Sequence, residues 1–311
     1  MNQQLISIVI PIYNSEKILP NLFEAIYAYA QSRSQEKYEV IFVSDCSPDK
    51  AWEVIKDLQS QHPDFVRGIK FSRNFGQQPA TIAGIAHAKG DFVITMDDDL
   101  QHDPNDIPLL LEAYRQDKDA HIVIAHLQNK KTTGFKKFVS NMNRRVTSIV
   151  LNKPPDIHLS AFRLIDRFTV DKMLKIRTAF PFIPALMFVI TKKVINVPLP
   201  HRERFEGESN YGIKRMIQLS SRLLINNSTI LLDMIATMGI LIALTSFLGI
   251  MAIVGLRISG IAFAPGWVSI ISSIYLMGGL ILFSLGIIGK YLQRILVEVT
   301  NMPNYVIEDI I

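Results

Sequence analysis

Two long runs of the sequence contain no charged residue, and they constrain the fold more than any other feature. Residues 234–256 and 258–289 are separated only by Arg257. Each run exceeds the roughly 20 residues that a helix needs to cross the hydrocarbon core of a membrane. Buried helices of a soluble protein are the alternative, but such helices rarely run this far without a polar stripe. The two runs therefore predict a transmembrane hairpin with a short turn at residues 257–267.

Basic residues near these runs predict their orientation. Arg257 is the one basic residue in the turn, whereas five basic residues lie close outside the pair. The five are Lys214, Arg215, Arg222, Lys290 and Arg294. Because basic residues are retained on the cytoplasmic side, we expect both ends of the hairpin in the cytoplasm. The sequence begins with a strand-like run and not with a signal peptide, so we expect an integral protein of the plasma (bacterial inner) membrane with both termini cytoplasmic.

The change in composition along the chain also predicts its domains. Residues 1–228 are an ordinary mixture of polar and apolar side chains, whereas residues 229–292 are almost uncharged. We expect a cytoplasmic domain, an amphipathic segment at the membrane surface, the helical hairpin and a cytoplasmic C-terminal tail. Their predicted bounds are 1–212, 213–228, 229–292 and 293–311.

The first part of the chain alternates short apolar runs rich in Ile and Val with stretches of helical character. Strands that alternate with helices are typical of a parallel sheet with helices on its faces. The expected strands are residues 5–12, 38–43, 66–71, 91–96 and 120–125, and the expected helices are residues 19–32, 51–59, 79–88 and 105–116. The sequence therefore predicts an α/β domain with a mostly parallel sheet.

Polar and acidic residues follow three of the expected strands. The first loop holds Tyr13, Asn14 and Glu16, the second holds Asp45, and the fourth holds Asp97, Asp98 and Asp99. In such sheets ligands bind beyond the carboxyl ends of the strands. We therefore expect these side chains to meet in a binding site at that edge.

The acidic triplet in the fourth loop favours a metal ion. Three adjacent carboxylates repel one another unless a cation lies among them. In an extended loop Asp97 and Asp99 point to the same side and can share a divalent ion, Mg²⁺ or Mn²⁺, with Gln101 as a further oxygen ligand. Acidic triplets also cap helices, and Asp103 or Asn105 is well placed to begin the next helix. The triplet alone leaves both interpretations open.

Other nucleotide-binding and nucleic-acid-binding classes lack their signatures. No glycine-rich turn of the GxGxxG or P-loop type follows the first strand, which argues against dehydrogenases and kinases. The net charge of +5 is compatible with nucleic acid, but no nucleic-acid-binding motif accompanies it. Contact with anionic membrane lipid accounts for the same charge, and we expect no nucleic-acid partner.

Several short motifs, taken in order and spacing, resemble inverting glycosyltransferases of family 2, in particular the polyprenyl-phosphate branch that is similar to dolichol-phosphate mannose synthase. The motifs are IPIYN at residues 10–14, DCSPD at 45–49, SRNFG at 72–76, MDDDLQ at 96–101, FRL at 162–164 and HRERFEGESNY at 201–211. The resemblance covers nearly the whole chain. It implies a GT-A fold, which is Rossmann-like, and metal-dependent transfer of a sugar from a UDP- or GDP-linked donor.

The same resemblance implies roles for individual residues. The implied donor-binding residues are Pro11, Tyr13, Asn14, Glu16, Asp45, Asp97, Asp98, Arg204 and Ser209. The implied metal ligands are Asp97, Asp99 and Gln101, and the implied catalytic residues are Asp99 and Arg204. Arg204 would contact the diphosphate from a segment, residues 202–211, that closes over the donor; a solvated charged loop is the alternative.

Three positions depart from the family pattern. Ser44 and Cys46 stand where many relatives have an acid and a glycine. Asp98 replaces a frequent alanine, a change that is tolerated if its side chain points away from the metal.

Residues 134–150 carry apolar side chains at helical spacing with basic residues between them. This pattern predicts a basic amphipathic helix at the membrane surface, although a core helix with one solvated face fits it too. Residues 213–225 show the same pattern. A lipid phosphate in the headgroup layer needs basic partners, and we expect Lys137, Arg145 and Arg163 to bind it.

Together these expectations describe one reaction. A single sugar passes from a nucleotide-diphosphate-sugar to a polyprenyl phosphate, undecaprenyl or dolichyl phosphate, with inversion and at the cytoplasmic membrane face. The alternatives are a family 2 enzyme acting on a glycan or glycolipid hydroxyl and a non-catalytic nucleotide-binding membrane scaffold. Small residues in the second apolar run suit packing between protomers, and the resemblance points to a homo-oligomer such as a tetramer. The sequence does not identify the sugar.

Overall fold

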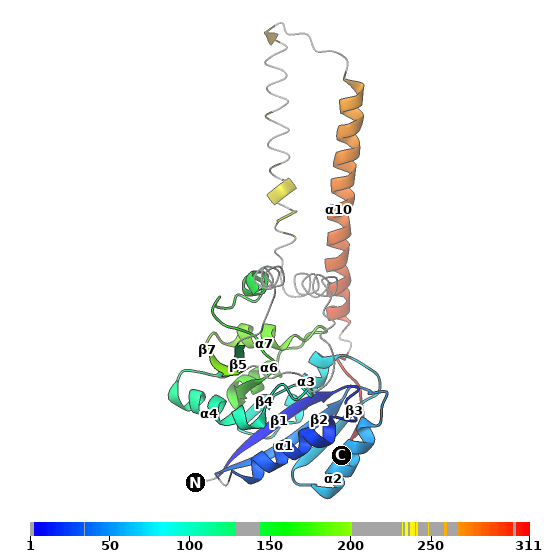
Figure 1. The fold of residues 1–311 in the computed structure, drawn as a ribbon. Coiled ribbons are helices and arrows are strands. Elements are labelled where there is room, and N and C mark those ends of the chain that lie inside the picture. Colours follow the sequence, from blue (N-terminus) through cyan, green and yellow to red (C-terminus); the bar gives the residue numbers. More distant parts are fainter. Residues whose placement is uncertain are drawn as a thin grey trace. The chain divides into compact units, whose positions relative to one another are not determined.

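The computed structural model describes residues 3–33, 35–128, 144–200, 266–300 and 303–311, with a few single positions between 232 and 259. The chain divides into two units, Met1–Gly212 with Met302–Ile311, and Ile213–Asn301. The first unit holds a β-sheet with its helices, and the second holds the long helix α10 (Figure 1).

The described strands of the first unit form one eight-stranded sheet in the order β7-β5-β6-β4-β1-β2-β3-β8. The strands are β1 (Gln4–Ile12), β2 (Glu36–Ser44), β3 (Val66–Phe71), β4 (Phe92–Thr95), β5 (Ile122–Gln128), β6 (Arg163–Asp166), β7 (Val194–Pro200) and β8 (Ile307–Ile310). Strands β1 to β4 are mutually parallel, and β5 pairs in parallel with β7. Only β6 and β8 among them run antiparallel to their neighbours. The structure confirms the α/β fold with a mostly parallel sheet.

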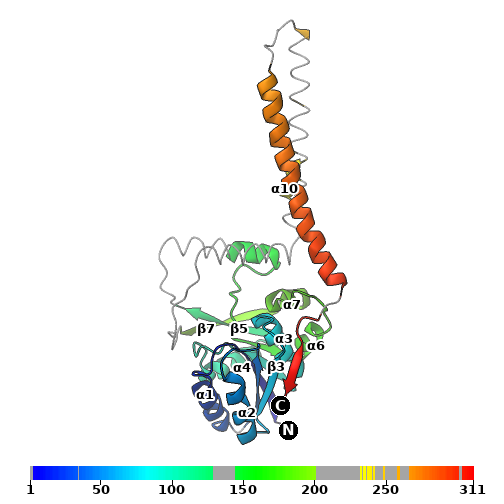
Figure 2. The ribbon, with the colours of Figure 1, turned by 90° about the vertical axis from the view of Figure 1, so that its right-hand side faces the viewer.

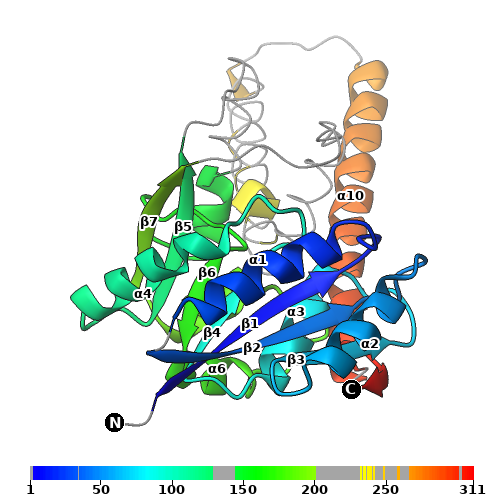
Figure 3. The same cartoon turned by 60° about the horizontal axis from the view of Figure 1, so that its bottom comes forward.

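Helices cover both faces of this sheet (Figure 3). One face packs against α1 (Leu19–Gln31), α2 (Ala51–Gln61) and α4 (Ile107–Gln116), and the other against α3 (Gln77–His87), α6 (Arg167–Met173) and α7 (Ile183–Ile190). Strand β1 supplies both cores because its side chains alternate: Ile8 and Ile10 face the first set of helices, and Val9 faces the second. The sheet is therefore packed between two apolar layers of side chains.

The five strands expected between residues 5 and 125 and the four helices expected between residues 19 and 116 all occur, within a few residues of their predicted bounds. The helix expected at residues 105–116 begins with a 3₁₀ turn, Pro104–Asp106, capped by Asp103, whose carboxylate accepts a hydrogen bond from the Asn105 amide at 2.8 Å. Strands β6, β7 and β8 and helices α6 and α7 were not predicted. Of the helix expected at residues 134–150, the structure describes residues 144–150, which are helical.

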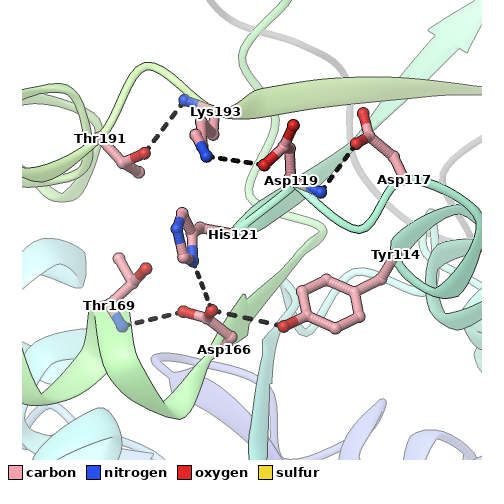
Figure 4. Close-up of polar contacts among 8 residues, drawn as sticks. All are labelled: Tyr114, Asp117, Asp119, His121, Asp166, Thr169, Thr191 and Lys193. Carbon is pink, nitrogen blue, oxygen red and sulfur yellow. Dashed lines mark hydrogen bonds and ion pairs between the residues drawn. The ribbon is translucent and has the colours of Figure 1, made fainter.

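A polar cluster ties the sheet to its helices at the amino ends of β4 and β5, the edge opposite to the loops singled out above (Figure 4). The Asp166 carboxylate accepts a hydrogen bond from the Thr169 amide at 2.8 Å, which caps α6. Its other oxygen lies 2.7 Å from Nδ1 of His121 and 3.4 Å from the Tyr114 hydroxyl. Burial, together with Asp166, raises the pKa of Tyr114. The cluster joins α4, β5, β6 and α6 and is part of the scaffold.

Strand β8 closes the sheet on the β3 side (Figure 2). Gly68 and Ile311 exchange two backbone hydrogen bonds, at 3.0 and 2.9 Å, and the ring of Tyr305 stacks on Phe71 with centroids 5.1 Å apart. The sequence predicts a tail at residues 293–311, and its last part is instead a strand of the sheet. The strand forms because the open edge of β3 offers unpaired backbone groups.

Helix α10 (Trp267–Val299) contains most of the second predicted span. Within the described residues it is the one helix long and apolar enough to cross a membrane, with a mean hydropathy of 1.6 over Met277–Val299. Most of the first predicted span and of the turn lies outside the described residues. The predicted hairpin, its orientation and the domain bounds remain predictions.

We expect Gly84→Ala to destabilise the first unit, because α3 crosses the sheet most closely at this glycine. An added Cβ would overlap the side chain of Val9 and lie 3.1 Å from Cγ2 of Val43. Overpacking of this kind costs about 1–3 kcal/mol, which thermal unfolding would detect as a lower Tm. Ala86→Leu adds more atoms to the exposed side of the same helix and is the control. An unchanged Tm for Gly84→Ala would contradict the close packing.

Candidate functional site

Each of the four loops that follow β1 to β4 contains one residue in the left-handed backbone region. These residues are Asn14 (φ 59°), Cys46 (φ 50°), Gly76 (φ 98°) and Leu100 (φ 59°). A left-handed residue reverses the chain sharply, which keeps all four loops close to the carboxyl edge of the sheet. The conformation of Cys46 is one that glycine adopts without strain.

The loops after β1 and β2 are joined by hydrogen bonds. The Glu16 amide donates to Asp49 at 2.8 Å, the Lys50 amide donates to Glu16 at 3.1 Å, and the Asn14 amide donates to Ser47 at 2.7 Å. Burial acts to raise the pKa of Asp49, but the hydrogen bonds that it accepts lower the pKa overall. Asn14 and Glu16, predicted to contact the donor, lie in this connection and not among the residues that line the cavity beside it.

Asp45 connects the loop after β2 to the start of α3. Its carboxylate is 3% exposed, and its two oxygens accept hydrogen bonds from the amides of Phe75 at 2.6 Å and Gly76 at 2.7 Å. Burial raises the pKa of Asp45, and the two amides partly offset this effect. The predicted donor-binding acid therefore already fixes the position of the helix.

A cavity of about 390 Å³ opens between these loops. Its lining residues are Pro11, Ile12, Tyr13, Asp45, Asn74, Gly76, Gln77, Asp97, Asp98 and Asp99. The structure thus brings together six of the predicted site residues, from three separate loops. It adds Asn74, Gly76 and Gln77, which follow β3; the SRNFG motif at residues 72–76 was the available signal, but no role was assigned to it.

The acidic loop is held from two sides. Oδ1 of Asp97 accepts a hydrogen bond from Nε2 of Gln77 at 2.5 Å, and its backbone amide donates to Nδ1 of His102 at 3.1 Å. His102 is 5% exposed and its ring stacks on Phe162 at 5.2 Å. Burial lowers the pKa of His102 to about 4, although Asp99 acts in the opposite direction, so the ring is neutral and can accept the bond. The sequence did not single out this histidine.

Asp98 and Asp99 make hydrogen bonds to different parts of the protein. The Asp98 carboxylate is hydrogen-bonded to the Ser15 hydroxyl and accepts a 3.5 Å bond from the Tyr13 amide, which joins the acidic loop to the loop after β1. Burial raises the pKa of Asp98 to about 6, with Ser15 and Tyr13 opposing the shift. Asp99 accepts a 3.2 Å bond from the backbone amide of Gln101.

Two carboxylates of the cavity have the chemistry of metal ligands. Asp97 and Asp99 both line the cavity and supply the carboxylate oxygens that hard divalent ions prefer. Within the described ranges, no three Asp, Glu, His or Cys side chains are grouped so as to hold an ion. The chemistry of the residues therefore fits part of a coordination shell, which a ligand with oxygen donors would have to complete.

The predicted acceptor residues are not gathered in this cavity. Arg163 is the first residue of β6, is 4% exposed, and lines a smaller adjoining cavity of about 240 Å³. Arg145 is exposed on the helical residues 144–150. Lys137, Arg204 and Ser209 lie outside the described residues.

Solved structures confirm the fold. The glucosyl-3-phosphoglycerate synthase of Mycobacterium tuberculosis, in complex with Mn²⁺, UDP-glucose and phosphoglyceric acid, is similar with a TM-score of 0.53 at 14% identity, over 71% of this chain and 78% of that one. The mannosyl-3-phosphoglycerate synthase of Rubrobacter xylanophilus gives a TM-score of 0.51 at 14% identity, over 71% and 72% of the two chains.

Sequence comparison identifies the family. A curated relative, the undecaprenyl-phosphate 4-deoxy-4-formamido-L-arabinose transferase of Enterobacter sp. (strain 638), is 30% identical over 98% of this chain and 93% of its own length. The model of glycosyl transferase family 2 matches residues 7–195. Both findings confirm the family expected from the motifs. The chain therefore belongs to glycosyl transferase family 2.

Proposed function

We propose that this protein transfers a single sugar from a nucleotide-diphosphate-sugar to a polyprenyl phosphate, with inversion, at the cytoplasmic face of the membrane. One observation carries the proposal: the chain matches an undecaprenyl-phosphate sugar transferase over 98% of its length, including the apolar part beyond the catalytic sheet. The carboxylate-lined cavity at the carboxyl edge of the sheet supports it, since this edge is where ligands bind in such folds.

The donor occupies the larger cavity. Pro11 and Tyr13 form the wall for the nucleoside, and Tyr13 is 51% exposed, so its ring is open to a base. Asp45 fixes Gly76, which lines another part of the same cavity. Arg204 and Ser209 remain proposed contacts of the diphosphate, and UDP and GDP both remain open as carriers.

Asp97 and Asp99 would hold a divalent metal, Mg²⁺ or Mn²⁺, with Gln101 as a further ligand. When bound, the ion would stabilise the negative charge of the departing diphosphate. A protein of the same fold was crystallised with Mn²⁺ and UDP-glucose, which supports a divalent ion as the cofactor. The hydrogen bonds from Gln77 and from the Gln101 amide orient the two carboxylates toward this task.

Catalysis of this transfer depends on aligning the two substrates and not on removing a proton from the acceptor. The acceptor phosphate is already ionised near pH 7, so its oxygen can attack the anomeric carbon without a general base. The new bond joins the anomeric carbon to that oxygen, the bond to the donor diphosphate breaks, and a nucleoside diphosphate leaves. Attack in line with the leaving group inverts the anomeric configuration. Basic residues, Lys137, Arg145 and Arg163 in this proposal, hold the acceptor phosphate in place.

Helix α10 supports the membrane part of the proposal. Its apolar stretch is long enough to span the hydrocarbon core, which would keep the enzyme in the membrane that carries its lipid acceptor. The hairpin with a second span, cytoplasmic termini and a homo-oligomeric assembly belong to the same proposal.

We expect Asp99→Ala to reduce sugar transfer by about 10²–10³-fold, because it removes a group that stabilises charge at the reacting centre. Asp98→Ala is the matched control: its carboxylate is bonded to Ser15 and Tyr13 and so holds the loop, and turnover should fall by less than about tenfold. The measurement is kcat with purified protein, alongside a thermal unfolding curve for each variant. Full activity in excess metal chelator would contradict the metal assignment.

The substrates can be identified in one assay. Membranes containing the protein are supplied with a panel of UDP- and GDP-sugars and undecaprenyl phosphate, and lipid products are analysed by mass spectrometry. We expect one lipid-linked monosaccharide, formed with one donor and absent for Asp99→Ala. A sugar found on a hydroxyl-bearing glycan or glycolipid alone would favour the alternative acceptor class, and nucleotide binding without turnover would favour a scaffold.

A further inference from the structure

Arg163 is a buried cation that has no ion-pair partner in the described part of the chain. Its side chain is 4% exposed, and no described carboxylate lies within 4.0 Å of its guanidinium group. Nε donates to Oγ1 of Thr95 at 3.2 Å and to the carbonyl of Ala161 at 3.4 Å, and Nη1 lies 3.4 Å from the sulfur of Met187. These contacts are neutral, and Asp97 compensates the charge only in part, from beyond 4.0 Å.

A buried charge at Arg163 lowers the stability of the folded protein. Burial lowers the pKa of Arg163 to about 10, with Asp97 acting in the opposite direction, so the group stays charged at neutral pH. Replacing a buried, unpaired charge with an apolar side chain of similar size often stabilises a protein. Retaining it therefore suggests that its counter-charge comes from a ligand.

The cavity at Arg163 has the composition that such a ligand requires. Its volume is about 240 Å³, and beside Arg163 it exposes the polar residues Thr95 and Ser160. Leu159, Phe182 and Pro184 form an apolar part of the same wall. An anion bonded to an apolar chain matches both parts of the wall, whereas a neutral sugar supplies no counter-charge for Arg163.

The two cavities share a wall. Gln77 and Asp97 line both of them and are hydrogen-bonded to each other at 2.5 Å. Three carboxylates line only the larger cavity, Asp97 lies in the shared wall, and the buried cation lines only the smaller cavity, so negative charge is concentrated on one side. An anion at Arg163 would therefore lie next to the donor without competing for its carboxylate side.

We propose that the Arg163 cavity binds the phosphate of the lipid acceptor, with Arg163 as its counter-charge and with Leu159, Phe182 and Pro184 against the first part of the isoprenoid chain. This inference rests on the proposed function. It assigns the acceptor to a defined cavity beside the donor, and it makes Arg163 a substrate-binding residue whose charge works against the stability of the free protein.

The test compares Arg163→Met and Arg163→Lys with the wild type, using the full chain in lipid nanodiscs. The Met side chain removes the charge at similar volume, and Lys keeps the charge without the planar group. We measure kcat, the KM for undecaprenyl phosphate, the KM for the donor and the Tm of the free protein. Arg167→Met is the control, because Arg167 donates to the carbonyls of Ala88 and Gly90 at the opposite edge of the sheet.

For Arg163→Met we expect the acceptor KM to rise at least tenfold, the donor KM to change less than twofold, and the Tm to stay level or rise. Arg163→Lys should lie between this variant and the wild type. Arg167→Met should lower the Tm and leave the acceptor KM unchanged. The opposite effects on stability separate a ligand-binding arginine from a structural one.

Two results would overturn the inference and leave the proposed function intact. The first is an unchanged acceptor KM in both Arg163 variants. The second is a rise in the donor KM alone, which would place the donor diphosphate at Arg163. If Arg163→Met does not fold, the Arg163→Lys values decide. A wild type that forms no lipid-linked product would instead reject the proposed function.

Discussion

The buried carboxylate of Asp45 accepts hydrogen bonds from two consecutive amides, those of Phe75 and Gly76, and so determines where α3 begins. The next residue, Gln77, donates to Asp97 and stands in the wall between the two cavities. Asp97 in turn is held through its amide by the neutral ring of His102. One series of polar contacts thus leads from β2 across α3 to β4. The series links the loops after three strands, and this keeps the shape of the site.

Charge is distributed unevenly along the carboxyl edge of the sheet. Four carboxylates line the larger cavity, and each of them has a hydrogen-bonding or electrostatic partner within the protein. The buried guanidinium of Arg163 lies in the adjoining cavity. A nucleotide-sugar and a lipid phosphate are both anionic, so an enzyme that joins them must separate their charges. In the proposed function, carboxylates that bind a metal ion would serve one substrate, and the permanent cation of Arg163 would serve the other.

The sequence was sufficient to predict five of the eight described strands and most of the larger cavity, because these depend on local rules. Alternation of apolar runs predicted β1 to β5, and the rule that ligands bind at carboxyl ends placed Tyr13, Asp45 and Asp97 together. Long-range contacts were not predictable in this way. Strand β6 has only four residues, and the pairing of β8 with β3 crosses most of the chain. Spacing also could not show that Asp45 faces two backbone amides.

Because β8 pairs with β3, the sheet can be completed only at the end of synthesis of the chain. Strand β3 leaves the ribosome early, but its partner is translated only after the apolar segment that contains α10. Nascent domains fold while synthesis continues, so one edge of the sheet stays open until the last residues are made. An open strand edge can pair with strands of other chains. Completion of the sheet therefore protects the edge of β3 only at the end of synthesis.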